Sequence, residues 1–372
     1  MTLKKLALLV TAMAGIGAAA LQAWPRQQAG AAGTLLVLSK GDLTMSAVDP
    51  ATLKVVGRVP SGPDPHEIIA SSDGRMAYIA NYNGGGNIIT PVDLVEMKAL
   101  MAIDLGPLRA PHGLTFAGAK LWFTAEGAKV IGSYDPAQKK IDWVLGTGQN
   151  RTHMIYVWPD LSRIVTSNVS SATLTIIEKV AGGGRGRGPG GPPPSAPDRT
   201  GAPPAAANRG GPPPGGRGGG PQTDWDETIV PVGRGAEGFD VSRDGREIWA
   251  ANAQDGTISI VDVASKKVTD TLAANVNGAN RLKFTPDGRH VLVSSLGGPD
   301  VAVFDAASRR EVKRVKTGRG AAGIEMQPDG ARAFVACTPD DYVAVIDLKT
   351  LEVSGRIEAG RQPDGLAWAP RR

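Results

Sequence analysis

The sequence predicts an all-β fold, a seven-bladed β-propeller that closes its ring by pairing the two ends of the repeat region. Three observations support this: a repeat of about 42 residues, turn signals at fixed places within it, and incomplete repeats at the two ends that complement each other. A period near 42 that contains only short strand segments is typical of propellers, with one four-stranded blade per repeat.

One strand type, which ends in an acidic residue, marks the repeat. These acidic residues are Asp49, Asp93, Asp135, Glu178, Asp262, Asp305 and Asp347. Successive members are 44, 42, 43, 84, 43 and 42 residues apart. Each aspartate precedes a turn segment, and Asp side chains in turns accept hydrogen bonds from nearby backbone N–H groups. We therefore assign the aspartates to turns and not to catalysis.

Each repeat contains four strand segments in the same order. The first ends in a turn such as the Pro-Asp-Gly of 286–288 or 328–330, where glycine supplies the positive φ of a tight reversal. A second segment such as 77–81 follows, then the acid-terminated third, then a Val-rich fourth such as 54–59. Valine, isoleucine and apolar–polar alternation predict half-buried strands throughout.

The two ends of the repeat region determine the number of blades. Residues 34–59 contain only a second, a third and a fourth segment, and residues 363–370 contain only a first one. Together they complete one blade, so the N-terminal strands pair with the C-terminal strand and no edge is left unpaired. With six further repeats, the propeller of residues 34–370 has seven blades.

Residues 181–223 explain the 84-residue interval, which equals two periods. Of these 43 residues, 26 are Gly or Pro, and alanine supplies the only other apolar side chains. Such a segment cannot bury enough apolar surface to offset the entropy lost on ordering it. The sequence therefore predicts a disordered insertion between the third and fourth strands of one blade, and not an eighth blade.

Residues 1–31 are predicted to be a signal peptide with a short linker. Lys4 and Lys5 precede an apolar, alanine-rich stretch over 6–21, and small residues such as Ala23 offer cleavage points. The stretch is shorter than the roughly 20 residues of a membrane span. We expect a periplasmic or secreted monomer with no transmembrane span after cleavage.

The net charge of +5 does not describe the folded body. Residues 1–33 carry three positive charges and the 181–223 insertion a net four, which leaves −2 for the remainder. A body of this charge does not favour nucleic acid as a partner. The Gly/Pro/Arg tract is typical of a solvated linker, with an arm that contacts cell-wall polymers or anionic lipid as the alternative.

Common enzyme motifs are absent from the sequence. It contains no HExxH zinc signature, no GxSxG elbow and no P-loop. The single cysteine, Cys337, excludes an intramolecular disulfide and a CxxCH haem attachment. Since Cys337 is a small residue at a strand end, we expect it to pack in the core and not to act as a nucleophile.

The repeat resembles the YVTN-repeat, or YncE-like, propellers. The matching pieces are AYIAN (77–81), RIVTSN (163–168), IWAAN (248–252) and VIDLKTLEVSGRIEAGRQPDGLA (345–367). The resemblance covers 34–180 and 224–370 and implies the fold. It implies little about activity, because the repeat consists mostly of core and turn residues and members of the family are mostly of unknown biochemical function.

One blade is similar to a different family. Residues 111–136, PHGLTFAGAKLWFTAEGAKVIGSYDP, look like a blade of the streptogramin (virginiamycin B) lyases, which read PHG…LWFTE…IGRIDP. That likeness implies a seven-bladed propeller that cleaves a cyclic ester by metal-assisted elimination. It covers one blade of seven, and the remaining blades follow the YVTN pattern.

Alignment of the repeats places one residue of each blade at the start of the innermost strand. These ring residues are His66, His112, His153, Glu237, Asn280, Ala322 and Asp364. The first strand of a propeller blade lies against the central axis, so three of the four histidines are expected at one mouth of the channel. We expect the 181–223 insertion at the opposite face, where third-to-fourth-strand loops lie.

Two further sets surround this ring. The second strands end at Lys40, Asn81, Glu126, Asn168, Asn252, Ser295 and Cys337, and the connections into first strands carry Arg109, Arg151, Arg234, Arg319 and Arg361. We take as candidate ligand-binding residues Arg109, Asn81, Asn168, Asn252, Asn280 and Asp364. The mouth thus combines imidazole, carboxylate, amide and guanidinium groups.

Three interpretations of this mouth stay open. Neutral imidazoles from His66, His112 and His153 with a carboxylate can hold Zn²⁺ or Cu²⁺, with Mg²⁺ as a third divalent ion, and Glu126 or Glu237 would then serve as acid or base. The same groups could bind an anionic ligand without metal, or they could simply be the polar lining of a water-filled channel.

The corresponding functions are also three. The first is an exported ligand-binding or interaction scaffold that takes a small molecule or an envelope component at the mouth. The second is a metal-dependent lyase or hydrolase that uses the same residues. The third is a structural protein of the cell envelope whose insertion contacts other polymers.

Overall fold

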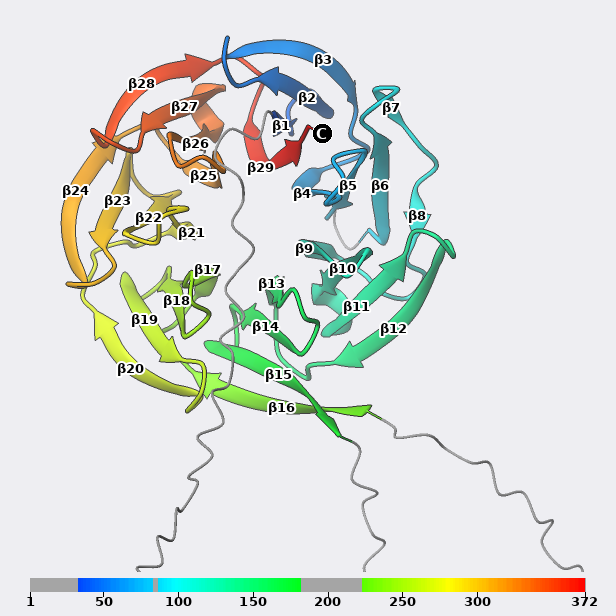
Figure 1. The fold of residues 1–372 in the computed structure, drawn as a ribbon, viewed down its shortest axis with the longest axis vertical. Helices are drawn as coiled ribbons and strands as arrows, with labels where there is room; N and C mark the ends of the chain where they lie inside the picture. Colours follow the sequence, from blue (N-terminus) through cyan, green and yellow to red (C-terminus); the bar gives the residue numbers. More distant parts are fainter. Residues whose placement is uncertain (1–32, 83–85, 182–222, 372) are drawn as a thin grey trace, which may run out of the picture.

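A computed structural model describes residues 33–82, 86–181 and 223–371. The predicted signal peptide and most of the predicted disordered insertion lie outside these residues; of the insertion, only Ala181 and Thr223 are described, and both belong to strands. Seven antiparallel sheets surround a central axis (Figure 1). The prediction of an all-β, seven-bladed propeller is confirmed.

The blades are numbered here in chain order, each with its innermost strand first. Blade 1 contains β29 (Pro363–Pro370), β1 (Gly33–Ser39), β2 (Thr44–Asp49) and β3 (Lys54–Pro60). Blade 2 contains β4 (Pro65–Ala70), β5 (Met76–Asn81), β6 (Ile88–Asp93), β7 (Lys98–Ala99) and β8 (Ile103–Asp104). Blade 3 contains β9 (Pro111–Ala117), β10 (Lys120–Ala125), β11 (Val130–Asp135) and β12 (Lys140–Gly146).

The remaining blades follow the same order. Blade 4 contains β13 (Thr152–Val157), β14 (Arg163–Asn168), β15 (Thr173–Ala181) and β16 (Thr223–Pro231). Blade 5 contains β17 (Ala236–Val241), β18 (Glu247–Asn252), β19 (Thr257–Asp262) and β20 (Lys267–Leu272). Blade 6 contains β21 (Ala279–Phe284), β22 (His290–Ser295), β23 (Asp300–Asp305) and β24 (Arg310–Lys316). Blade 7 contains β25 (Ala321–Met326), β26 (Arg332–Cys337), β27 (Tyr342–Asp347) and β28 (Glu352–Ile357).

Blade 1 closes the ring as the sequence predicts. The C-terminal strand β29 pairs antiparallel with β1, with Leu35 opposite Trp368 and Val37 opposite Leu366. Strands from the two ends of the described region therefore share one sheet (Figure 1). This pairing satisfies the backbone groups of both strands, so neither is an exposed edge.

The outer strand of blade 2 is interrupted, which the sequence pattern did not indicate. Both short strands, β7 and β8, pair with β6. Between them the N–H of Leu100 donates to the carbonyl of Pro91 in β6. Because Pro91 has no N–H, it cannot donate a hydrogen bond back to the outer strand. Met101, which follows Leu100, is 92% exposed.

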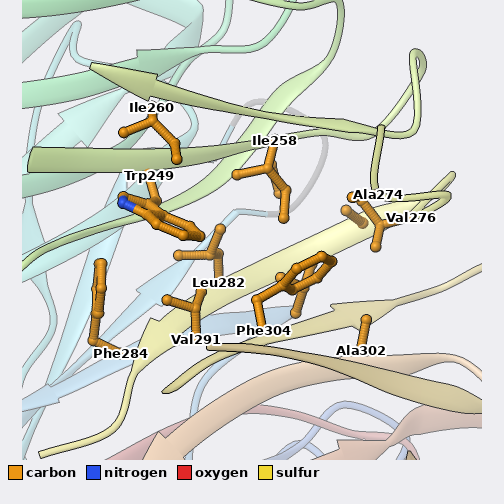
Figure 2. Close-up of a cluster of buried hydrophobic side chains, with 13 residues drawn as sticks. Trp249, Ile258, Ile260, Ala274, Val276, Leu282, Phe284, Val291, Ala302 and Phe304 are labelled. Atoms are coloured by element: carbon orange, nitrogen blue, oxygen red, sulfur yellow. The ribbon is translucent and has the colours of Figure 1, made fainter. Parts of the chain in front are cut away.

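The hydrophobic core lies between neighbouring blades. Seven clusters of buried side chains fill the seven interfaces between adjacent sheets. In Figure 2, Trp249 and Ile260 of blade 5 face Leu282 and Phe304 of blade 6. The alternation of apolar residues along the strands supplies one face to each neighbouring blade.

The acid-terminated strands end as predicted for turns. The Oδ1 atom of Asp49 accepts the N–H groups of Ala51 and Thr52, and Asp347 makes the same pair of bonds to Lys349 and Thr350. Cys337 is fully buried in the core between blades 6 and 7. Neither the aspartates nor the cysteine takes part in the site described below.

Candidate functional site

The repeat brings the predicted ring residues to one level of the channel. Each is the second residue of an innermost strand: His66 in β4, His112 in β9, His153 in β13, Glu237 in β17, Asn280 in β21, Ala322 in β25 and Asp364 in β29. We call this end of the channel the histidine mouth. In blade 4, the antiparallel register puts Ala181 and Thr223 at the opposite end of the sheet from His153.

A left-handed residue precedes every ring residue by two positions. These residues are Asp64, Ala110, Arg151, Gly235, Gly278, Gly320 and Gln362, with φ between 41° and 76°. Glycine takes this conformation without strain, whereas other residues adopt it at a cost. Blades 5, 6 and 7 use glycine. Asp64 and Arg151 instead bring a charged side chain to the mouth.

His153 lies between two carboxylates. Its Nδ1 contacts Oε1 of Glu126, and its Nε2 is 3.1 Å from Oε1 of Glu237. Burial opposes the charged imidazolium, but the hydrogen bonds and charges of the two glutamates outweigh it and raise the pKa of His153. Arg151 reaches the same glutamates, with its guanidinium 3.1 Å from Glu237 and 3.7 Å from Glu126.

His112 has the opposite environment. Its side chain is buried, and its Nδ1 has no hydrogen-bond partner among the described residues. Burial lowers the pKa of His112 well below its usual value, and the positive charge of His153 adds to this effect. The two rings lie 3.8 Å apart between centroids. The surroundings therefore favour the neutral form of His112 and the charged form of His153.

His66 has partners of its own. Its Nε2 is 2.7 Å from the ammonium of Lys40, and its Nδ1 is 3.3 Å from Asp364. Burial lowers the pKa of His66, against the attraction of Asp364. Its ring lies 5.3 Å from that of His112 between centroids. His66 therefore belongs to the mouth but is engaged by Lys40 and Asp364.

Three of these residues form a group that could hold a metal ion. One ligand atom each from His112, Glu126 and His153 lies within 4.8 Å of the others, and all three residues are buried. Ligands at about 2.0 Å from a tetrahedral Zn²⁺ lie about 3.3 Å apart, so small side-chain rotations would close the group on an ion. The predicted metal set was His66, His112 and His153; the structure brings Glu126, and not His66, into this group.

The predicted amide ligands form most of their hydrogen bonds within the protein. The Asn81 amide donates to the carbonyls of Ser61 and Pro63. Asn168 and Asn252 each donate to two hydroxyl groups of the next strand in the same blade. Their role toward a ligand stays a prediction. The buried Oδ1 atoms of Asn252 and Asn280 have no hydrogen-bond partner among the described residues.

Two residues of the mouth escaped the sequence interpretation. Tyr82, which directly follows Asn81, donates its hydroxyl to Oε2 of Glu126 at 2.6 Å, and burial raises its pKa to about 12. Asp64 lies 3.5 Å from Lys40. Both residues lie outside the aligned strand positions: Tyr82 is one residue after Asn81, and Asp64 is two residues before His66. Predicted Arg109 lies in the connection before β9, where its carbonyl accepts the N–H of Gly127.

Comparisons with known proteins support the fold alone. No family model matches the chain, and no curated protein sequence matches it. A solved protein of unknown function from Desulfotomaculum acetoxidans is similar, with 12% identity and a TM-score of 0.69 over 91% of this chain and 99% of that one.

A candidate 6-phosphogluconolactonase from Bacteroides uniformis is also similar, with 13% identity and a TM-score of 0.66 over 90% of this chain and 99% of that one. The dihydro-haem d1 dehydrogenase NirN matches at 16% identity and a TM-score of 0.57, and this chain covers 65% of it. Identities this low establish a shared propeller and carry no activity across.

Proposed function

We propose that this chain is an exported propeller of the YVTN-repeat type that binds a small ligand or envelope component at its histidine mouth. We further propose that His112, Glu126 and His153 hold a divalent transition metal there as part of the binding site. The export signal of 1–31 and the repeat pattern are the sequence support for the first part. The geometry of the mouth supports the second.

The unpartnered Nδ1 of His112 is the observation that carries the metal proposal. A buried polar atom without a hydrogen bond is costly, and the cost is removed if the atom ligates a metal. The lowered pKa of His112 favours the neutral form in which imidazole binds metals, whereas His153, whose pKa is raised, would release its proton on binding. Two imidazoles and one carboxylate favour Zn²⁺ or Cu²⁺ over Mg²⁺, which prefers oxygen ligands.

The contacts of Arg151 support a role beyond lining. Its guanidinium lies 3.1 Å from Glu237 and 3.7 Å from Glu126, the two glutamates on either side of His153. Its left-handed backbone is common to this position in all seven blades and does not distinguish it. An anionic ligand at the mouth could interact with the Arg151 guanidinium and the Lys40 ammonium beside the metal group.

Metal binding by matched variants tests the proposal. We expect the purified protein to bind one equivalent of Zn²⁺ or Cu²⁺ by calorimetry, and His112→Ala to weaken binding by about 100-fold or more. His290→Ala is the control, because His290 is the only histidine outside the mouth and lies in β22. Absence of stoichiometric binding, or equal binding by His112→Ala and the parent, would refute the metal site.

A metal-dependent lyase or hydrolase is the second candidate. One observation favours it: Oε1 of Glu237 lies 3.1 Å from Nε2 of His153, which places a second carboxylate beside the metal group as a candidate acid or base. A bound metal would polarise a carbonyl or acidify water. We expect Glu237→Gln to retain metal and to lose turnover of lactone or ester substrates. Turnover that survives in Glu237→Gln, or that occurs without added metal, would contradict this candidate.

A further inference from the structure

The innermost strands carry a second set of polar residues, three positions after the histidine ring. The fifth residue of the strand is Tyr156 in β13, Asp240 in β17, Lys283 in β21 and Glu325 in β25. Four consecutive blades thus direct a polar side chain from the same strand position. All four residues line a cavity of about 910 Å³ at the mouth opposite the histidines.

An ion pair separates this cavity from the histidine mouth. Glu67 in β4 and Arg281 in β21 are the third residues of their strands, between the two polar levels. Blades 2 and 6 are not neighbours, so the hydrogen bond from Arg281 to Glu67 crosses the channel. Both side chains are buried. The pair therefore bridges the channel at a level between the two mouths.

The carboxylates of the cavity are mostly satisfied by the protein. Asp240 accepts the N–H groups of Val241 and Phe284. Asp287 and Asp329 lie in turns, where each accepts a side-chain hydrogen bond and a backbone N–H. Glu325 makes no side-chain hydrogen bond to a described residue, and burial raises its pKa to about 7. At neutral pH this carboxyl can therefore donate an O–H.

The cations of the cavity have unused hydrogen-bond donors. Lys283, Arg243, Arg289 and Lys349 line it, and none of these side chains forms a hydrogen bond or close ion pair with a described residue, although the charge of Lys283 acts on the nearby Asp240 and Glu325. Apolar walls accompany them, among them the Trp368 ring. Most of the cavity's hydrogen-bonding groups without a described protein partner are therefore cationic donors, and they lie beside an apolar surface. A volume of this size suits a small organic ligand.

We propose that this opposite mouth is a second ligand site, and that it binds a small organic anion through Lys283 and the neighbouring arginines. The anionic group is a carboxylate or a phosphate, since both match ammonium and guanidinium donors. The body of the ligand is apolar or aromatic and packs on the Trp368 side of the cavity. This site is independent of the metal group at the histidine mouth.

A ligand-observed NMR titration tests this proposal with four probes. Phenyl phosphate and benzoate should bind, inorganic phosphate should bind more weakly, and benzylamine should not bind. We expect Lys283→Met to weaken phenyl phosphate binding at least about tenfold, the loss of one charge-assisted hydrogen bond. Lys283→Arg should restore most of the binding, which separates loss of the contact from loss of the fold.

Two controls locate the site. Lys313→Met removes an ammonium on the outer strand β24, where it contacts Thr350 and Glu352, and should leave binding unchanged. His112→Ala should also leave it unchanged, so this proposal can fail or hold whatever the outcome at the metal group. The proposal is overturned if benzylamine binds as well as phenyl phosphate, if Lys283→Met binds like the parent, or if His112→Ala abolishes binding.

Discussion

The cross-channel ion pair gives a stability prediction that can be worked from the structure. Arg281 is 6% exposed and Glu67 is 9% exposed, and they come from strands on non-neighbouring blades. Besides Glu67, the carbonyl of Asn280 in the same strand is the only other acceptor of this guanidinium among the described residues. Breaking a buried pair by removing one partner costs about 3–5 kcal/mol, because a charge is left buried without compensation.

The two single variants should differ in their pH dependence. Glu67→Gln leaves an arginine that cannot lose its proton, so its cost should be constant between pH 5 and 8. Arg281→Met leaves a glutamate that can take up a proton, which costs about 1.4 kcal/mol per pH unit above an ordinary pKa near 4.3. The destabilisation by Arg281→Met is thereby limited to about 4 kcal/mol at pH 7.3 and about 1.4 kcal/mol at pH 5.3.

Urea denaturation at these two pH values measures both effects. The double variant Glu67→Met with Arg281→Met removes both charges and should be more stable than either single variant, since apolar residues often replace buried ion pairs without loss. The contrary result would be single variants that each cost less than about 1 kcal/mol and whose costs add up in the double variant. The pair would then be as well solvated as an ion pair on the surface. That result would refute the separation of the two mouths.

Three further predictions concern stability and reactivity. The pKa of Glu325 is raised to about 7, so its protonated form contributes fully to the free energy of unfolding below the ordinary glutamate pKa, and this contribution is lost as pH rises through 7. The free energy of unfolding measured in urea should therefore fall by up to about 3 kcal/mol between pH 5 and 8, and Glu325→Gln should remove this fall. A Cβ at Gly113 would clash with the backbone carbonyl of His153, whereas a Cβ at Gly146 would meet open space. Gly113→Ala should therefore destabilise the protein by more than about 2 kcal/mol and Gly146→Ala by less than about 0.5 kcal/mol. Equal costs would contradict the close approach of the strands. Burial raises the pKa of Cys337 to about 11, so iodoacetamide at pH 8 should alkylate it only after unfolding; rapid alkylation of the folded protein would show otherwise.

The fold was predictable because each sequence repeat of a propeller forms one blade. An interval of about 42 residues between acid-terminated strands corresponds to one blade, and the incomplete repeats at the ends predict their own pairing. The interrupted outer strand of blade 2 was not predicted. The outer strand pairs of blades 1, 3, 5, 6 and 7 have a register shift at the equivalent position, and in blade 2 Pro91 also lacks the N–H that would continue the ladder there. The alternation of side chains does not reveal this combination.

The level of the histidine ring was also predictable, but its chemistry was not. Symmetry places His66, His112 and His153 at one mouth, since each occupies the same strand position. Their three environments depend on partners from other strands and connections: Lys40 at His66, none at Nδ1 of His112, and two glutamates at His153. Repeat alignment compares equivalent positions and is blind to contacts between non-equivalent ones. For this reason Glu126 was expected as an acid or base and not as a ligand.

Successive positions along the innermost strands give the channel two polar levels, and each level carries one of the two proposed sites. Glycines at the third position, such as Gly238 and Gly365, allow neighbouring strands to approach so closely that a Cβ would meet the next backbone. Where this position carries Glu67 and Arg281, the channel is bridged. The second and fifth positions then face separate mouths. Because the clusters between blades supply the core, these inward polar residues can vary without dismantling the fold.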